Sequence, residues 1–523
     1  MMEIYSKGKL SPHLLYRNAD FDFEQELPPE HVEMFADIGI NIIVESMARG
    51  DKKIKDACEK VLFRGITDLK EIRYRQEVVR DALDNTDTVR RIFSMLNDAV
   101  DKARKQLFWL GSSNPEYSLH ESVSIMKLYV SVLEDLRKAA ETSYNSFTSE
   151  GFRNLFSQII NEFNDGYVSK VKENLSRLEF PYGVKVIGKL SRDCEPTELK
   201  LVKPELRHRR GLNLARLGER KLTYVLPERD ESGFQELANI RNKSLMPVTV
   251  ALKYASENLL NFINGLISEF AFLIGCINLH EDIGKIGAST VFPDPKPQDE
   301  NALGFEGLYD ISLLIKLGGN VVSNSLPFGN QKLIMITGAN RGGKSTFLRS
   351  VGQSLIMMKA GIYVAANGYT ASTFSNIQTH FKREEEKEMT MGKLDEELDR
   401  MDKILNRLSN GSVVLFNESF AATNAIEASQ IAKEIITGLV ENGVRIIFVT
   451  HLYELASLFL DKPHEYVRFL VAERLESGER TFRIIGGIPT ATSYAEDLFK
   501  NIFKPGGEGG TNPSQSGESD QGD

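Results

Sequence analysis

The sequence predicts a mixed fold: an all-α region with a small β-rich insertion, followed by an α/β domain. Apolar residues recur at three- and four-residue intervals from about residue 28 to 178. Short β-like runs separated by Pro, Gly and charged residues occupy 179–247, and apolar strands alternate with helical patterns from 298 to 488. These periodicities are typical of packed helices, of short strands and of a mostly parallel sheet covered by helices.

Length and composition limit the class of protein. The 523 residues are too many for one hydrophobic core and correspond to about three domains. Hydrophobic residues make up 41% and charged residues 26%, and we find neither an export leader nor a long uncharged apolar run. We therefore expect a soluble, cytoplasmic protein with no membrane partner. Cys58, Cys194 and Cys276 lack C-x-x-C spacing, which predicts buried thiols and disfavours disulfides or a zinc site.

The helical region, residues 1–178, is predicted from amphipathic segments. Each segment places its apolar residues on one helix face, which favours a helical bundle over a coiled coil or a partner-binding helix with the same period. The clearest faces are Met126, Tyr129, Leu133, Leu136 and Ala140 in one segment, and Phe152, Leu155, Phe156, Ile159, Ile160 and Phe163 in the next.

Residues 179–247 are predicted to form a separate β-rich module with strands at 182–190 and 221–226. The module holds the most basic stretch of the chain. Such a cluster fits a solvated surface and contacts with DNA phosphates equally well, and the net charge of −9 excludes only a uniformly basic nucleic-acid binder. The DNA-binding candidates are Arg207, Arg209, Arg210, Arg216, Arg220 and Lys221.

A long helix is predicted to resume near residue 248 and to end before the proline-rich stretch 292–297. Residues 248–297 are therefore assigned as a connecting helix and linker, and 298–504 as the α/β domain. The tail, 505–523, contains Gly, Ser, Glu and Asp but no large apolar residue, and we expect it to be disordered. The buried side of the long helix carries Leu259, Leu260, Ile263, Leu266, Ile267 and Phe270.

A glycine-rich loop between an apolar strand and a helix is the most specific motif. Residues 334–346 read IMITGANRGGKST and fit the pattern G-x-x-x-x-G-K-[ST]. In such loops backbone N–H groups surround phosphate oxygens, the lysine reaches the outer phosphates and the hydroxyl ligates Mg²⁺. The sequence therefore predicts binding of ATP and Mg²⁺ by Gly338, Ala339, Asn340, Arg341, Gly342, Gly343, Lys344, Ser345 and Thr346, with Ser345 as a metal ligand.

Hydrolysis requires a second group of residues, which organises the metal and activates water. The apolar run 413–416 ends at Asn417 and Glu418, and the run 445–450 ends at His451. In parallel sheets, ligands bind at the carboxyl ends of the strands. We expect Asn417 to act at the metal, Glu418 to be the catalytic base and His451 to sense the γ-phosphate or the attacking water; local capping or a structural histidine are the alternatives.

These residues together resemble the ATPase domain of the MutS mismatch-repair family. Residues 337–349 are similar to that family's phosphate loop, TGPNMGGKST, and 449–455 resemble its ATHYFEL segment. Residues 360–366 and the strand ending at Asn417 are also similar, and 66–79 resemble the start of the family's lever or core domain. The resemblance implies an α/β P-loop (ABC-type) ATPase domain, and it makes the β-rich module similar to a reduced clamp.

The resemblance also implies a homodimer in which a signature segment from one subunit completes the site of the other. Residues 392–398 lie where that segment is expected, with Gly392 in place of the family's serine. Asn417 stands where the family has Asp, which removes a negative charge from the metal site. Asn324 resembles the nucleotide-base-contacting loop, although Val321 replaces its aromatic residue.

The chain begins almost directly with the helical region, so we expect no N-terminal mismatch-recognition domain. The predicted function is a DNA-binding ATPase that clamps double-stranded or branched DNA in repair or recombination. The alternative is a nucleotide-gated scaffold with little hydrolysis and a protein partner, suggested by Asn417 and Gly392. Transporter and chromosome-type ATPases of the same superfamily are disfavoured because no LSGGQ-like signature and no long coiled coil are found.

Overall fold

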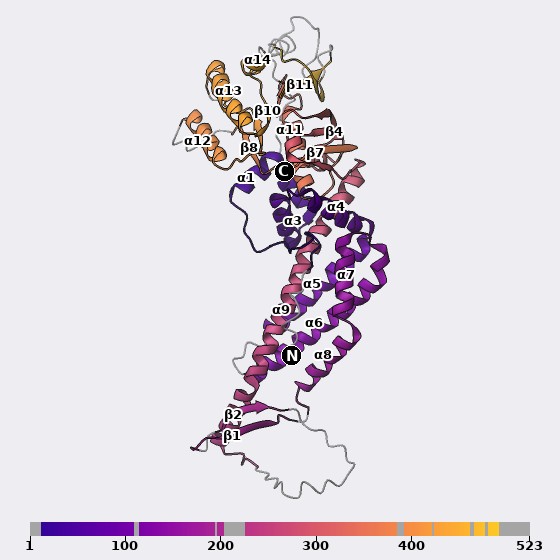
Figure 1. Cartoon of the computed structure of the whole chain (residues 1–523), viewed down its shortest axis with the longest axis vertical. Coiled ribbons are helices and arrows are strands. Elements are labelled where there is room, and N and C mark those ends of the chain that lie inside the picture. Colours follow the sequence, from indigo (N-terminus) through magenta and orange to yellow (C-terminus); the bar gives the residue numbers. More distant parts are fainter. Residues whose placement is uncertain are drawn as a thin grey trace, which may run out of the picture. The chain divides into compact units, whose positions relative to one another are not determined.

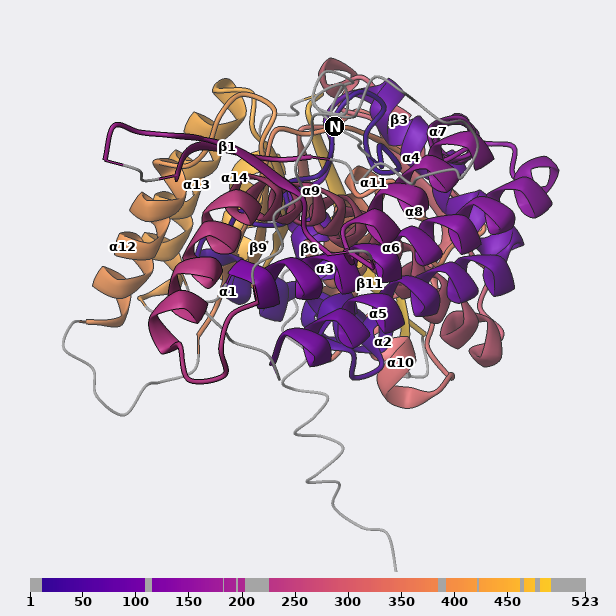
Figure 2. The same cartoon turned by 90° about the horizontal axis from the view of Figure 1, so that it is seen from below.

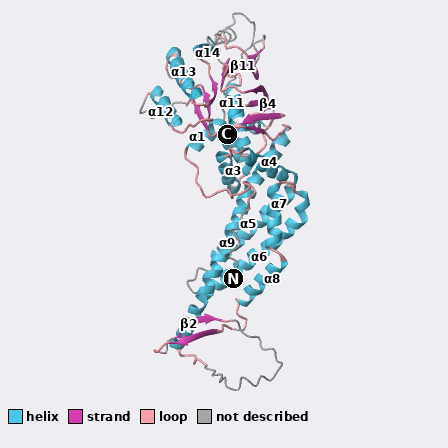
Figure 3. Ribbon diagram, viewed as in Figure 1, coloured by secondary structure: helices cyan, strands magenta, loops and turns pink. Residues whose placement is uncertain are grey.

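The computed structural model describes residues 12–108, 115–181, 183–193, 196–202, 225–383, 392–420, 423–460, 465–475 and 480–490. The chain divides into two compact units that are interleaved in sequence (Figure 1). Unit 1 contains Met1–Pro295, Ile311–Gly319 and Gln353–Tyr369, and unit 2 contains Lys296–Asp310, Asn320–Gly352 and Thr370–Asp523. Helices dominate unit 1 and most of the strands lie in unit 2 (Figure 3), so the mixed fold predicted from the sequence is confirmed.

The predicted helical region is confirmed as a series of helices in unit 1. Side-chain caps explain several of their starts: the Asp51 carboxylate accepts hydrogen bonds from the N–H groups of Lys53 and Ile54, and Asp68 caps the next helix in the same way. The helices are α1 (Glu30–Ile38), α2 (Ile40–Ala48), α3 (Lys52–Arg64), α4 (Leu69–Asp84), α5 (Thr86–Phe108), α6 (Pro115–Ser143), α7 (Glu150–Glu162) and α8 (Asp165–Arg177), with a 3₁₀ turn, η2 (Tyr144–Ser146).

The long helix α9 (Glu231–Ile286) is the central helix of unit 1, and α2, α3, α5 and α6 pack along it (Figure 2). It begins at its N-cap Asp230, well before the predicted start near 248, because the helix continues through Pro247. The helix α9 is long enough, and one 18-residue window of it is apolar enough, to span a membrane, although no such run was expected from the sequence. However, 72% of that window is buried in the protein, as in the core helix of a soluble domain.

The β-rich module is smaller in the structure than in the prediction. An antiparallel pair, β1 (Val186–Leu190) and β2 (Pro196–Leu201), accounts for its described strands, and β1 confirms the strand predicted at 182–190. Of the second predicted strand, 221–224 lie outside the described residues, and Val225 and Leu226 are not in a strand. Residues 231–247 belong to α9 instead. The DNA-binding candidates from Arg207 to Lys221 and the tail also lie outside the described residues.

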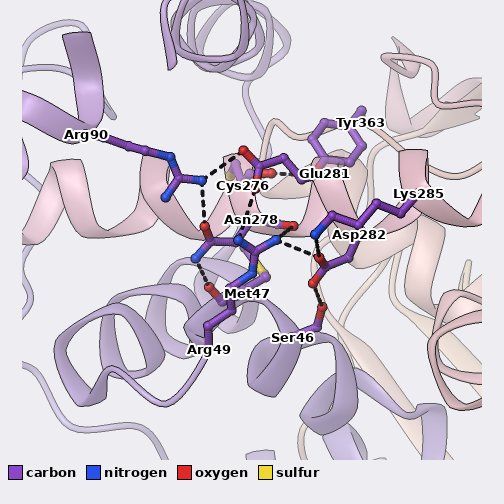
Figure 4. A network of polar contacts seen from close by, with 10 residues as sticks. All are labelled: Ser46, Met47, Arg49, Arg90, Cys276, Asn278, Glu281, Asp282, Lys285 and Tyr363. Atoms are coloured by element: carbon purple, nitrogen blue, oxygen red, sulfur yellow. Dashed lines mark hydrogen bonds and ion pairs between the residues drawn. The ribbon is translucent and has the colours of Figure 1, made fainter. Parts of the chain in front are cut away.

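A polar network joins α2, α5 and α9 near the end of α9 (Figure 4). The buried Asn278 amide donates to the Met47 carbonyl oxygen at 2.8 Å and accepts from Arg90 Nη2 at 3.0 Å. Arg49 adds ion pairs to Glu281 at 3.0 Å and Asp282 at 2.6 Å. Although partial burial acts in the opposite direction, hydrogen bonds from Arg49 and other donors lower the pKa of both carboxyl groups.

Replacing Asn278 with Ala is expected to destabilise unit 1 by about 1–3 kcal/mol, since the Met47 carbonyl oxygen loses its donor and Arg90 loses one acceptor. The measurement is urea denaturation followed by far-UV circular dichroism. Lys285→Ala is the control: its ion pair with Asp282 is solvent-exposed and should contribute less than about 1 kcal/mol. Equal effects of the two substitutions would contradict a structural role for the Asn278 amide.

Unit 2 is built around a six-stranded sheet ordered β12-β11-β6-β10-β9-β8, in which β12 is antiparallel to β11 and the other neighbours are parallel. The strands predicted at 334–337, 413–416 and 445–450 are confirmed as its central members. Its strands are β6 (Leu333–Thr337), β8 (Ile377–Phe381), β9 (Val413–Asn417), β10 (Arg445–Val449), β11 (Val467–Arg474) and β12 (Arg480–Gly486).

Helices and a smaller sheet complete unit 2. Strands β4 (Leu303–Leu308) and β5 (Asn324–Gly329) pair antiparallel. Apolar side chains of α13 and α14 join those of β9 and β10 in one buried core. The other elements of unit 2 are η4 (Gln298–Glu300), α12 (Lys393–Leu405), α13 (Ala425–Glu441) and α14 (Tyr453–Leu460). Three elements have residues in both units, β3 (Asp294–Lys296), α11 (Lys344–Lys359) and β7 (Gly368–Ser372), and α10 (Ile311–Leu317) belongs to unit 1. Of the cysteines, Cys58 and Cys276 are free and buried as expected, and Cys194 lies outside the described residues.

Candidate nucleotide-binding site

The predicted phosphate loop connects the end of β6 to the first residue of α11. Its glycines are required by backbone geometry. Gly338 and Gly343 have φ values of +114° and +91°, in the region that favours glycine. A Cβ atom at Gly338 would lie 3.0 Å from the Ala472 amide nitrogen, and one at Gly343 would lie 3.1 Å from the Phe482 carbonyl oxygen. The loop is therefore held closely against β11 and β12, at the start of a helix whose N-terminus favours anions.

Lys344 places a positive charge inside this loop. Its side chain is buried, with 4% of the residue exposed, and Nζ donates to the carbonyl oxygens of Gly338 at 2.9 Å and Ala339 at 3.0 Å. Burial lowers the pKa of Lys344, and the nearby Glu418 carboxylate acts against that shift. A buried ammonium group held by carbonyl oxygens is incompletely neutralised, and this fits a loop that receives phosphate groups.

Ser345 and Asn417 meet beside the loop. The Ser345 hydroxyl donates a hydrogen bond to the Asn417 Oδ1 atom at 2.9 Å. Asn417 is the last residue of β9 and lies opposite Val449 of β10, which in turn pairs with Ile336 of β6. A hydroxyl and an amide oxygen are hard oxygen donors of the kind that bind Mg²⁺, and Mg²⁺ keeps several of its waters in such sites. The pair therefore fits Mg²⁺, although it supplies no negative charge.

Glu418 and His451 follow adjacent parallel strands at the same edge of the sheet. Glu418 comes directly after β9, is half-buried, and has a left-handed backbone with φ of +55°. Its N–H donates to the Val449 carbonyl oxygen at 2.9 Å, which fixes its backbone to β10. His451 lies two residues beyond β10 and is exposed. The structure thus brings the loop, Ser345, Asn417 and Glu418 to one edge of the sheet, with His451 following the neighbouring strand.

Two other predicted site residues have different surroundings. The buried Asn324 amide is bound to β12: its Oδ1 accepts from the Ile484 N–H at 2.7 Å, and its Nδ2 donates to the Phe482 carbonyl oxygen at 3.5 Å. Gly392 is the N-cap residue of α12, and its carbonyl oxygen accepts from the Glu396 N–H at 3.0 Å. Among the described residues, no hydrogen bond joins Gly392 to the phosphate loop.

The residues that pack against the loop and the Glu418 turn were not predicted from the sequence. Phe482 approaches the loop through its backbone, and Ala472 through its backbone and its methyl group, so neither offers a distinctive side chain as a signal. His380, Ser419 and Glu397, which contact one another next to the Glu418 turn, were not predicted either. Ser419 follows Glu418 directly, and that adjacency was the one available signal.

Two family models match separate parts of the chain. The family model described as "MutS2 N-terminal domain" matches residues 67–286, from just before α4 to the end of α9. The model described as "MutS domain V" matches residues 334–485, from β6 into β12. The second match contains the phosphate loop, Asn417, Glu418 and His451, and the first contains most of the helices of unit 1.

Several curated proteins named "Endonuclease MutS2" are similar to part of the chain. The protein of Brevibacillus brevis is 29% identical over 162 residues, that of Geobacillus thermodenitrificans 30% over 175, and that of Clostridium botulinum (strain Okra) 30% over 190. These alignments cover 31%, 33% and 35% of this chain but only 20%, 22% and 24% of the respective relatives. Since two separate MutS models and these relatives all match, this chain belongs to the MutS family.

Proposed function

We propose that the chain is a DNA-associated ATPase whose dimer closes on DNA when nucleotide binds. The observation that carries the proposal is the grouping of a buried lysine, the Ser345–Asn417 hydrogen bond and Glu418 at one edge of a parallel sheet. Each of these groups has a role in nucleotide hydrolysis, and each is held in place. Lys344 Nζ is bound to two loop carbonyl oxygens, Ser345 and Asn417 to each other, and the Glu418 backbone to Val449. Such preorganisation is the main contribution that a protein makes to phosphoryl transfer.

The residues of the site have separate proposed roles in binding and hydrolysing ATP. The N–H groups of 338–346 and the Lys344 ammonium bind and orient the phosphates. Ser345 and Asn417 would hold Mg²⁺, which when bound neutralises charge on the phosphate oxygens. Glu418 accepts a proton from the attacking water, or orients that water by a hydrogen bond. His451 is proposed to contact the γ-phosphate or the same water. Asn324, on β5 and hydrogen-bonded to Ile484 of β12, is proposed to act near the nucleotide base.

Replacing Asn417 with Asp is expected to lower the Mg²⁺ concentration needed for half-maximal ATP hydrolysis by roughly 3- to 10-fold, because a carboxylate adds a negative charge to the metal site. The Ser345 hydroxyl keeps an acceptor in this variant, so the local hydrogen bond survives. The measurement is a Mg²⁺ titration of the steady-state ATPase rate. The control is Asn424→Asp, at the N-cap of α13, where the side chain already accepts from main-chain N–H groups.

An unchanged Mg²⁺ requirement in Asn417→Asp, or an equal change in Asn424→Asp, would contradict the assignment of Asn417 to the metal site. Mg²⁺-dependent protection of the free protein against thermal unfolding gives a second readout that does not depend on turnover. Asn417→Asp should show the larger protection, since the ion binds the folded state alone.

The dimer and the DNA are the parts of the proposal that rest on family membership. We assign Gly392 and Lys393, at the start of α12, to the segment that completes the partner's site. We assign Arg207, Arg209, Arg210, Arg216, Arg220 and Lys221 to contacts with DNA phosphates, which are independent of sequence. The preferred DNA is branched or otherwise structured. The relatives are named endonucleases, but the alignments cover less than a quarter of those proteins, so no endonuclease activity is proposed for this chain.

The experiment that tests the DNA assignment is equilibrium binding to matched duplex, mismatched duplex and a four-way junction, at one near-physiological salt concentration. We expect the junction to bind most tightly when a non-hydrolysable ATP analogue and Mg²⁺ are present. Sedimentation velocity of the same samples should show a dimer. A preference for the mismatch would contradict structured DNA as the substrate, and no binding to any of the three would favour a protein partner.

A second candidate is a nucleotide-gated scaffold that scarcely hydrolyses ATP. Two observations favour it: Asn417 supplies no charge to the metal site, and Gly392 has no side chain to reach a nucleotide. Comparing turnover by the parent with turnover by Glu418→Gln distinguishes the two functions. If the parent is no faster than the variant, the scaffold is the correct function.

A further inference from the structure

The turn that carries Glu418 has an unfavourable backbone conformation. Glu418 and Phe420 have φ values of +55° and +63°, although neither is glycine. A left-handed backbone conformation costs a residue with a side chain about 1–2 kcal/mol of free energy, so it persists only where surrounding contacts stabilise it. Two of them in three consecutive positions, directly after the strand that ends at Asn417, indicate that the position of Glu418 is determined by other parts of unit 2.

Ser419 supplies the first of these contacts. Its residue is 1% exposed, and its hydroxyl lies 2.8 Å from His380 Nδ1 and 2.6 Å from the His380 carbonyl oxygen. His380 is on β8, the strand next to β9, where it lies opposite Phe416. The hydroxyl thereby ties the residue after Glu418 to both the side chain and the main chain of one residue in the neighbouring strand.

His380 connects this contact to α12. The imidazole is completely buried, and its Nε2 lies 3.1 Å from the Glu397 carbonyl oxygen. Because a carbonyl oxygen only accepts, Nε2 must carry the proton of the neutral ring, and Nδ1 is then an acceptor. The single proton of the Ser419 hydroxyl is therefore shared between Nδ1 and the His380 carbonyl oxygen. Burial, together with the charge of Arg400, lowers the pKa of His380 to about 4, so the ring is neutral near pH 7.

Phe420 is held by the same two residues. Its ring stacks on the His380 ring with centroids 5.3 Å apart and planes 18° apart. Its backbone N–H donates to the Glu397 carboxylate. Burial raises the pKa of Glu397 above its ordinary value, although this hydrogen bond acts in the opposite direction. The residue after Ser419 is thus fixed from β8 on one side and from α12 on the other. The contacts on Ser419 and Phe420 together offset the strain of the turn.

We propose that His380 and Ser419 are positioning residues for hydrolysis: they hold the turn after β9 so that Glu418 lies in its working position, with α12 as the anchor. This inference rests on the proposed ATPase function. It also makes the placement of α12 a determinant of the hydrolysis rate, since the helix holds His380 and Phe420 through Glu397.

The test compares single-turnover ATP hydrolysis and ATP affinity in the parent, Ser419→Ala and Glu418→Gln, alone and combined. We expect Ser419→Ala to slow hydrolysis roughly 10- to 100-fold, because a small displacement of a catalytic group has effects of that size. The dissociation constant for ATP should change less than about twofold, since the phosphate loop is untouched. In the Glu418→Gln background, Ser419→Ala should cause no further loss, because its effect acts through Glu418.

Ser412→Ala is the matched control. Ser412 is a buried hydroxyl at the opposite end of β9, bonded to the Ser409 N–H at 2.9 Å and to the Ser375 hydroxyl at 3.0 Å. Its loss should lower the melting temperature about as much as Ser419→Ala and leave the hydrolysis rate within twofold of the parent, roughly the range of a substitution remote from the site. His380→Asn and His380→Leu serve as a second pair should Ser419→Ala not fold: Asn keeps an acceptor near the Nδ1 position and should retain more rate than Leu.

Each outcome decides the question. A parent that is no faster than Glu418→Gln would overturn the ATPase function and this inference with it. If the parent hydrolyses ATP faster than Glu418→Gln but at the same rate as Ser419→Ala, this inference alone is overturned. Ser419→Ala would also be shown as merely structural if it weakened ATP binding as much as it slowed hydrolysis, or if it slowed Glu418→Gln further by the same factor.

Discussion

Glu418→Gln is expected to lower the rate of ATP hydrolysis by roughly 100- to 10,000-fold, the range for removal of a general base. Glutamine has nearly the shape of glutamate and still accepts hydrogen bonds through its amide oxygen, but it does not take a proton from water. The left-handed turn and the bond from the Glu418 N–H to Val449 depend on the backbone, so the fold should be unaffected. The loss therefore belongs to the chemical step.

ATP binding by Glu418→Gln should be unchanged or tighter. The Glu418 charge acts on Lys344 in the free protein, and its removal takes a negative charge away from the phosphate region. Rates are measured as phosphate release and affinities with a fluorescent ATP analogue. Glu427→Gln, an exposed residue in the first turn of α13, is the control and should behave as the parent. A parent rate no higher than that of Glu418→Gln would contradict hydrolysis by this site and, with it, the role of Glu418 as the base.

Lys344→Ala is expected to weaken ATP binding by roughly 10- to 100-fold or more, since each hydrogen bond to a charged group contributes about 1.5–3 kcal/mol. The same substitution should leave the melting temperature of the free protein unchanged or raised. The reason is that Lys344 is a buried cation whose described contacts are carbonyl oxygens of its own loop, and burial of such a charge is unfavourable.

Lys332→Ala provides the matched control for Lys344→Ala. Lys332 precedes β6, at the opposite end of the strand that leads into the phosphate loop. Isothermal titration calorimetry with a non-hydrolysable ATP analogue gives the affinities, and differential scanning calorimetry gives the melting temperatures. Lost affinity together with a large fall in melting temperature would show that Lys344 stabilises the loop and is not poised for phosphate.

Much of the fold was predictable from the sequence because the signals are local. Amphipathic spacing predicted the helices between 28 and 178, and the apolar runs before Gly338, Asn417 and His451 predicted three strands of a mostly parallel sheet. The phosphate loop was predictable for a related reason: its glycines satisfy backbone conformations that the loop itself requires, with positive φ at Gly338 and Gly343.

The errors have physical causes. The start of α9 was placed near 248 because polar and charged residues precede it, yet the Asp230 cap begins the helix and Pro247 removes only one hydrogen bond from it. The apolar window of α9 was missed because its residues were considered as one helix face, whereas other helices surround it and bury several of its sides.

The support of the site was not predictable, because it depends on contacts between distant segments. His380 and Ser419 are 39 residues apart in sequence, and nothing in either segment shows that β8 lies next to β9. Phe482 packs on the loop through main-chain atoms, and Ala472 through main-chain atoms and a single methyl group, so neither stands out in the sequence. Topology, not residue type, creates both features.

The coupling of the phosphate loop to DNA is the central claim, and one measurement tests it most directly. The affinity of the protein for a four-way junction is measured with and without a non-hydrolysable ATP analogue and Mg²⁺, for the parent and for Lys344→Ala. We expect the analogue to change the parent's affinity by roughly 5- to 150-fold, the usual range of coupling between sites, and to leave Lys344→Ala unchanged. Equal affinities of the parent with and without the analogue would contradict the claim.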